Sequence, residues 1–172
     1  MVNSRHPVVD VYDQLRTARL NVRYLEAELR RLGKINFGIE IVLAVSASST
    51  CAGLWLWNNA FGGDLWKLLS AVAAILAVLK PKINLTKLIQ GREELLAGYK
   101  TLDHDLQKIT ILINQRQKYD DELKKNFVSA LNRKGELVKM EKQPKLNEKL
   151  RLRCYEQVLT ELPETSFFVP KE

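Results

Sequence analysis

The chain has 172 residues, of which 46% are hydrophobic and 27% are charged, and it carries a formal net charge of +7. This length allows one domain, or a membrane hairpin with one helical module, and the positive charge favours anionic partners such as lipid headgroups, nucleotides or nucleic acid. The two cysteines, Cys51 and Cys154, lie far apart in the sequence, which excludes a zinc-binding spacing and a disulfide framework.

A heptad pattern predicts an amphipathic helix within residues 1–36. Pro7 suits the first turn of a helix, and the charged, periodic start of the chain is unlike a signal peptide. About four heptads follow. Their apolar positions are Val8, Leu15, Val22 and Leu29, with Val11, Ala18, Leu25 and Leu32 three residues later. Such a helix buries only a narrow stripe, so it needs a helical partner.

Residues 37–80 predict a transmembrane hairpin. Residues 41–63 and 68–79 contain no charged side chain, and only Asp64 and Lys67 stand between these runs. The first span, residues 41–57, gives about 25 Å of helix, at the short end of what crosses a bilayer core. Tryptophans cluster at the tip and basic residues flank both ends, which places both termini on the cytoplasmic side of the inner (cell) membrane. The alternative is a buried hairpin inside a soluble helical bundle.

Small and hydroxyl residues line faces of the two runs and are candidates for lining a pore or for packing helices together. In the first run they are Ser46, Ser49, Thr50 and Gly53, and in the second run they are Ser70, Ala74 and Ala77. Packing within the hairpin alone would explain one such face. An oligomeric pore lined by hydroxyls is the other interpretation.

A second heptad pattern predicts a long helix over residues 81–132, about 75 Å in length if uninterrupted. Its seam residues are Leu88, Leu95, Leu102, Ile109 and Leu123, with Tyr99, Leu106, Ile113 and Phe127 on the companion position, and it is interrupted by Arg92, Arg116 and Asp120. Both long helices enter the hairpin from one side, so we expect their first parts to pair antiparallel as a coiled-coil stalk while the rest overhangs.

The last segment, residues 133–172, predicts a turn around Gly135 and Pro144 and then a helix over residues 145–162, folded back on the overhang or on a neighbouring subunit. Its basic residues could bind an anion or a partner, or form a solvated face. The candidates are Lys142, Lys145, Lys149, Arg151 and Arg153. The pair Phe167 and Phe168 is either a docking peptide or packs against the preceding helix.

No motif for catalysis, cofactor binding or metal binding stands out. His104 lies between Asp103 and Asp105, and consecutive residues fan around a helix rather than converge, so a solvated charged face is the expected explanation. Phosphate-binding loops and nucleophile motifs are missing from the sequence. We therefore expect a protein that is not an enzyme and has no cofactor, no metal and no specific nucleic-acid partner.

The segment RTARLNVRYLEAELRRLGKINFGIEIVLA, together with the order of amphipathic helix, short hairpin and long helix, resembles the SLATT family. These are two-transmembrane effectors of bacterial nucleotide-signalling immune systems. The resemblance implies a membrane effector that oligomerises to form a pore or disrupt the membrane in antiphage defence, triggered by a sensor protein or a nucleotide second messenger. Its alternatives are a membrane-anchored coiled-coil scaffold and a soluble helical-bundle adaptor.

Overall fold

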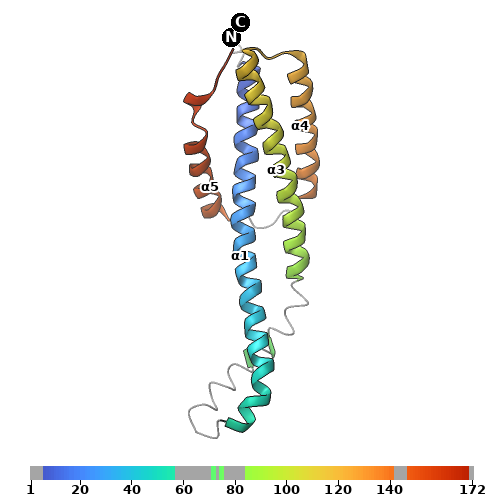
Figure 1. The fold of residues 1–172 in the computed structure, drawn as a ribbon, viewed down its shortest axis with the longest axis vertical. Helices are drawn as coiled ribbons and strands as arrows, with labels where there is room; N and C mark the ends of the chain where they lie inside the picture. The colour runs from blue at the N-terminus through green and yellow to red at the C-terminus, as the bar shows by residue number, and fades with distance from the viewer. Residues whose placement is uncertain (1–5, 57–70, 73, 76–83, 142–146, 171–172) are drawn as a thin grey trace. The chain divides into compact units, whose positions relative to one another are not determined.

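The computed structural model describes residues 6–56, 71–72, 74–75, 84–141 and 147–170. The regular structure in these ranges is helical, which confirms the all-α class. It comprises α1 (Pro7–Leu56), α3 (Leu85–Arg116), α4 (Asp121–Met140), α5 (Glu148–Glu161) and the short 3-10 helix η1 (Glu164–Ser166) (Figure 1). The chain divides into two compact units. We call Met1–Glu28 with Arg92–Glu172 the bundle, and Leu29–Gly91 the middle unit.

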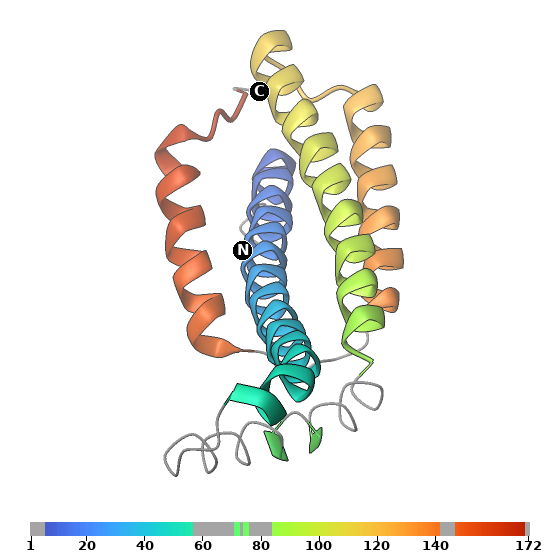
Figure 2. The ribbon, with the colours of Figure 1, turned by 60° about the horizontal axis from the view of Figure 1, so that its bottom comes forward.

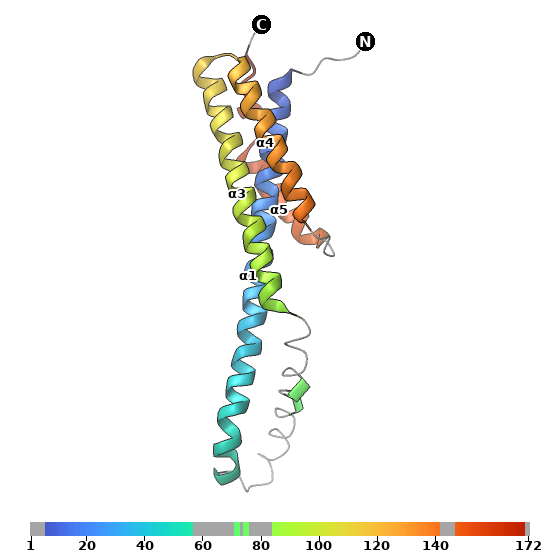
Figure 3. The ribbon, with the colours of Figure 1, turned by 90° about the vertical axis from the view of Figure 1, so that its right-hand side faces the viewer.

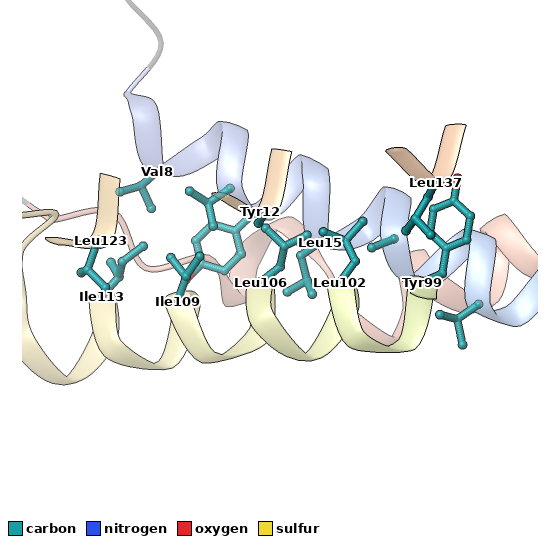
Figure 4. Packing of buried hydrophobic residues seen from close by; sticks show 14 of the residues in the cluster. Val8, Tyr12, Leu15, Tyr99, Leu102, Leu106, Ile109, Ile113, Leu123 and Leu137 are labelled. Atoms are coloured by element: carbon teal, nitrogen blue, oxygen red, sulfur yellow. The ribbon is translucent and has the colours of Figure 1, made fainter. Parts of the chain in front are cut away.

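Helices α1 and α3 pair antiparallel within the bundle, as their heptads predict. Arg19 pairs with Asp103 and Glu26 pairs with Lys100, each at 2.8 Å, so residue numbers rise along one helix while they fall along the other. The two seams meet in one buried cluster (Figure 4). From α1 and α3 it contains Val8, Val11, Tyr12, Leu15, Ala18, Val22, Leu25, Leu95, Tyr99, Leu102, Leu106, Ile109 and Ile113.

The prediction of one uninterrupted helix over residues 81–132 is wrong. Helix α3 ends at Arg116, Gln117 adopts the left-handed region with φ 54°, and α4 starts after Asp120. The side chain of Asp120 accepts a hydrogen bond of 3.0 Å from the backbone N–H of Leu123, which caps the new helix. Arg116 Nη1 donates to Asp120 Oδ2 at 2.9 Å. Arg116 and Asp120, two of the residues that interrupt the second heptad pattern, therefore form the turn.

Helix α4 folds back along α3, so the predicted overhang is also wrong (Figure 3). Leu123, Ala130 and Leu137 of α4 join the buried cluster. The two helices approach closely at Gly98, where an added Cβ would overlap Leu137 Cδ2. The predicted turn at Gly135 does not form, because α4 continues to Met140. A glycine inside a helix costs about 1 kcal/mol, less than the packing of α4 on α3 contributes.

Helix α5 confirms the predicted last helix, but it packs on α1 rather than on the second long helix. Asn147 caps its N-terminus by accepting a hydrogen bond of 3.2 Å from the backbone N–H of Leu150. The backbone N–H of Asn147 donates to Tyr24 Oη at 3.2 Å, and at the other end of α5 the carbonyl of Leu162 accepts hydrogen bonds from the guanidinium of Arg16. These contacts set α5 antiparallel to α1 (Figure 2).

Candidate functional site

The candidate pore-lining residues belong to the middle unit. Ser46, Ser49, Thr50 and Gly53 lie in α1, where the backbone is helical and the structure describes side chains only as far as Ala44. Ala74 is exposed in a short helical stretch, while Ser70 and Ala77 lie outside the described residues. A hydroxyl-lined pore stays a prediction.

The described part of the middle unit contains no buried residue, including its apolar ones. Its exposed large apolar side chains are Ile35, Phe37, Ile41, Val72, Ile75 and Leu88, with exposed fractions from 42% to 64%. Within the described part of the chain, no helix combines the length and the apolar content needed to cross a bilayer. The predicted second span, residues 68–79, lies mostly outside that part.

The predicted basic site does not converge in the described part of the chain. Lys142 and Lys145 lie outside it, while Lys149, Arg151 and Arg153 are exposed on α5. Residues two apart on a helix point about 200° apart, so Arg151 lies on the other side of α5 from Lys149 and Arg153, which are four residues apart and share a face. A solvated basic face explains the described members.

One of these residues, Arg151, does line an open groove between α1 and α5. The groove has a volume of about 520 Å³ and is also lined by Thr17, Leu20, Glu148, Leu152 and Tyr155. Leu152 and Tyr155 are 62% and 47% exposed. Because Glu148 sits beside Arg151 in this groove, the lining offers both charges rather than a positive site for an anion.

The two aspartates of the Asp103-His104-Asp105 triplet connect α3 to neighbouring helices. Arg19 Nε donates to Asp103 Oδ1 at 2.8 Å and Arg19 Nη2 donates to Asp103 Oδ2 at 3.0 Å. Asp105 pairs with Arg133 of α4, and His104 is exposed. The hydrogen bonds that Arg19 donates to Asp103 raise the pKa of the Arg19 guanidinium, although partial burial opposes that shift. No group of metal-ligating side chains occurs among the described residues.

The C-terminal tail packs on α1, so the expectation that it packs against the preceding helix is wrong. The rings of Phe167 and Tyr12 stack with their centroids 4.0 Å apart, and the Arg16 guanidinium lies 4.4 Å from the Phe167 centroid. Arg16 Nε and Nη2 donate to the Leu162 carbonyl at 2.9 and 2.6 Å. The backbone N–H of Phe168 donates to Tyr12 Oη at 3.2 Å. The sequence signal for the contact between the tail and α1 is Tyr12, an aromatic residue that directly follows the seam residue Val11.

Two tyrosines of the bundle have raised pKa values because burial disfavours the phenolate. For Tyr99 the negative charge of Glu141 adds to the effect of burial, and for Tyr119 the charge of Asp10 does so. Both shifts move the phenols further from ionisation at neutral pH. These side chains therefore act as packing groups with a neutral hydroxyl.

The polar side chains of the bundle thus mainly connect its helices in pairs. Arg19, Arg23 and Arg16 tie α1 to α3, α5 and the tail, and Arg133 ties α4 to α3. The apolar seams of α1 and α3 could have joined separate copies of the chain, but within the bundle they pack against each other in one chain. No protein-family model, curated protein or solved structure matches the chain.

Proposed function

We propose that the chain is a membrane protein whose apolar segment, residues 41–79, enters the bilayer as a hairpin and carries the bundle in water. The observation behind this proposal is the contrast between the two units. The bundle packs many of its apolar side chains into one buried cluster, whereas no described side chain of the middle unit is buried, and Phe37 and Ile75 are 64% and 59% exposed. An exposed side chain of this size forgoes about 1.5–3 kcal/mol of burial free energy in water, which lipid would supply.

The finer proposal is an oligomeric pore that acts as an effector in antiphage defence. It is supported by the hydroxyl stripe of Ser46, Ser49 and Thr50 and by the resemblance to the SLATT family. A sensor protein or a nucleotide would act on the bundle, whose helices are the part able to bind a soluble partner. The change between closed and open states then requires that the trigger bind the two states with different affinity.

Membrane binding is tested first, with the full-length chain. Cell membranes are washed with alkaline carbonate, and purified protein is floated with vesicles of phosphatidylethanolamine and phosphatidylglycerol. We expect the chain to stay in the pellet and to float. Ala47→Arg should weaken both results, because an arginine near the middle of a span costs about 2.5–3.5 kcal/mol. Ile111→Arg, at an exposed position of the bundle, is the matched control and should change neither. Release of the wild type by carbonate would favour the soluble adaptor instead.

Pore formation needs a separate test, because an anchored scaffold would pass the first one. Membrane potential and dye leakage are measured in cells that express the wild type or the double variant Ser46→Leu and Ser49→Leu. A pore predicts leakage that the double variant loses while it stays in the membrane fraction. If no trigger causes leakage, the membrane-anchored coiled-coil scaffold is the remaining function. The exposed apolar face of α4 favours that alternative.

A further inference from the structure

Helix α4 carries an apolar stripe that nothing in the bundle covers. Val128, Leu131 and Val138 are 55%, 38% and 52% exposed. Together with Gly135 they recur at spacings of three and four residues, the pattern of a coiled-coil seam. A Cβ built at Gly135 would meet no atom within 4 Å. We call these four residues the α4 stripe.

The α4 stripe lies on a different face from the side of α4 that packs in the core. Ala130 and Leu137 are buried and face α3, and Lys134 donates to Gln14 of α1. Position 131 is rotated by about 100° from position 130 around the helix, so Leu131 points out of this packed side. Three large apolar residues on one exposed helix face are unusual for a surface that stays in water, since they form a contiguous patch rather than scattered single residues.

The charges beside the α4 stripe identify the partner it fits. Along the exposed edge next to Val128 the order is Asp121, Lys125, Asn132, Glu136 and Lys139, so the signs read minus, plus, neutral, minus, plus. Asp121 also pairs with Lys124 of its own helix at 2.8 Å, a surface pair that contributes little. In a second copy of α4 that lies antiparallel to the first, the same charges follow one another in the opposite order. When Val128 of one copy faces Leu131 of the other, the same register sets Lys125 against Glu136 and Asp121 against Lys139. In antiparallel helix pairs the same edge of each helix meets its symmetry mate, so both pairs form twice.

We infer that the α4 stripe is a self-association surface, through which two copies of this chain pair by an antiparallel, two-fold contact between their α4 helices. In this contact the side chain of Leu131 lies beside Val128 of the second copy, and the missing side chain at Gly135 lets the backbones approach. The parts of the α1 and α3 seams that lie in the bundle cannot serve this purpose, because they are buried in one cluster within each chain. The inference concerns the bundle and does not rest on the proposed membrane function.

Charge reversal tests the contact with the full-length chain in detergent micelles, by sedimentation over a range of protein concentrations. Lys125→Glu turns two attractive pairs into repulsive ones and should raise the dimer dissociation constant by about tenfold. The double variant Lys125→Glu with Glu136→Lys restores opposite charges and should recover most of the lost affinity. Lys149→Glu, an equal change on the exposed face of α5, should leave the constant unchanged.

Disulfide cross-linking tests the register independently, in a chain that carries Cys51→Ala and Cys154→Ala. Val128→Cys with Leu131→Cys should give a covalent dimer on mild oxidation, in intact cells as well as in detergent. Asn126→Cys with Ser129→Cys has the same spacing on another exposed face and should give little. Circular dichroism checks that each variant keeps its helices. A monomer at all concentrations, or equal cross-linking by both pairs, overturns the inference and leaves the stripe to a different protein. Because neither test depends on vesicle binding, its failure is distinct from failure of the membrane proposal.

Discussion

Arg92 of α3 and Glu28 of α1 face each other as a largely buried ion pair, with 3.5 Å between Arg92 Nε and Glu28 Oε2. Their side chains are 7% and 19% exposed. The separation makes an ion pair but is too long for a good hydrogen bond, and Glu28 Oε2 has no hydrogen-bond partner among the described residues. In sequence the two residues directly adjoin the ends of the middle unit, Leu29 and Gly91. The charge that interrupts the second seam thus has its counter-charge on the first helix.

Replacing one charged residue of this pair should lower the free energy of unfolding more than replacing both. Arg92→Met leaves Glu28 as an unpaired, mostly buried carboxylate, and we expect a loss of about 3 kcal/mol in the free energy of unfolding. The double variant Arg92→Met with Glu28→Met replaces both charges by apolar groups and should regain most of that loss. Urea unfolding followed by circular dichroism measures the cycle. If the two single losses simply add in the double variant, the pair is not coupled.

The turn between α3 and α4 is strained at Gln117, whose φ of 54° is costly for a residue with a side chain. Gln117→Gly should therefore stabilise the chain by about 1 kcal/mol. Gln115→Gly, two residues earlier in α3, is the matched control and should destabilise it by about 1 kcal/mol, because glycine is a poor helix former. Thermal unfolding of both variants should show shifts of opposite sign. Shifts of the same sign would contradict the left-handed assignment.

The close approach of α3 and α4 depends on Gly98. Gly98→Ala should destabilise the bundle by about 1–3 kcal/mol, because the added methyl group overlaps the buried side chain of Leu137 and the core must shift. Gly91→Ala, in the same helix with open space around it, should instead stabilise the chain by up to about 1 kcal/mol. Chemical unfolding of the two variants provides the comparison. Relief of the Gly98→Ala loss by Leu137→Val would identify Leu137 as the obstacle.

The helix cap at Asp120 should make stability depend on pH in the acid range. The backbone N–H of Leu123, and then Arg116, hold the pKa of Asp120 below its usual value. A depressed pKa in the folded state gives stability that is present above the unfolded pKa, about 3.9, and is lost as the pH falls through the folded pKa. The stability advantage of the wild type over Asp120→Asn should therefore shrink below about pH 4. Chemical unfolding at several pH values tests this, and an advantage that stays constant would count against it.

The sequence alone determined the helices and the antiparallel pairing of α1 with α3. Heptad spacing is a local property, and one face of Val8, Leu15 and Val22 can be buried only against another helix with a matching stripe. The sequence also set the apolar segment apart from the two heptad helices, and the large apolar side chains described in and beside it, such as Phe37 and Ile41, are exposed.

Only the tertiary structure decided where the second long helix ends. Ile109 and Leu123 are separated by two full heptads, so the seam resumes in register after the charged positions Arg116 and Asp120. Charged residues also interrupt continuous helices, so this interruption does not by itself show that the helix ends. The turn exists because α4 can bury Leu123 and Leu137 against α3 while Asp120 caps its first turn. Contacts between residues far apart in the sequence decide where such a helix ends. The contact of Phe167 with Tyr12 is another contact of this long-range kind. Once α4 had folded back, its outer stripe became a surface, which no linear pattern of the sequence distinguishes from a core.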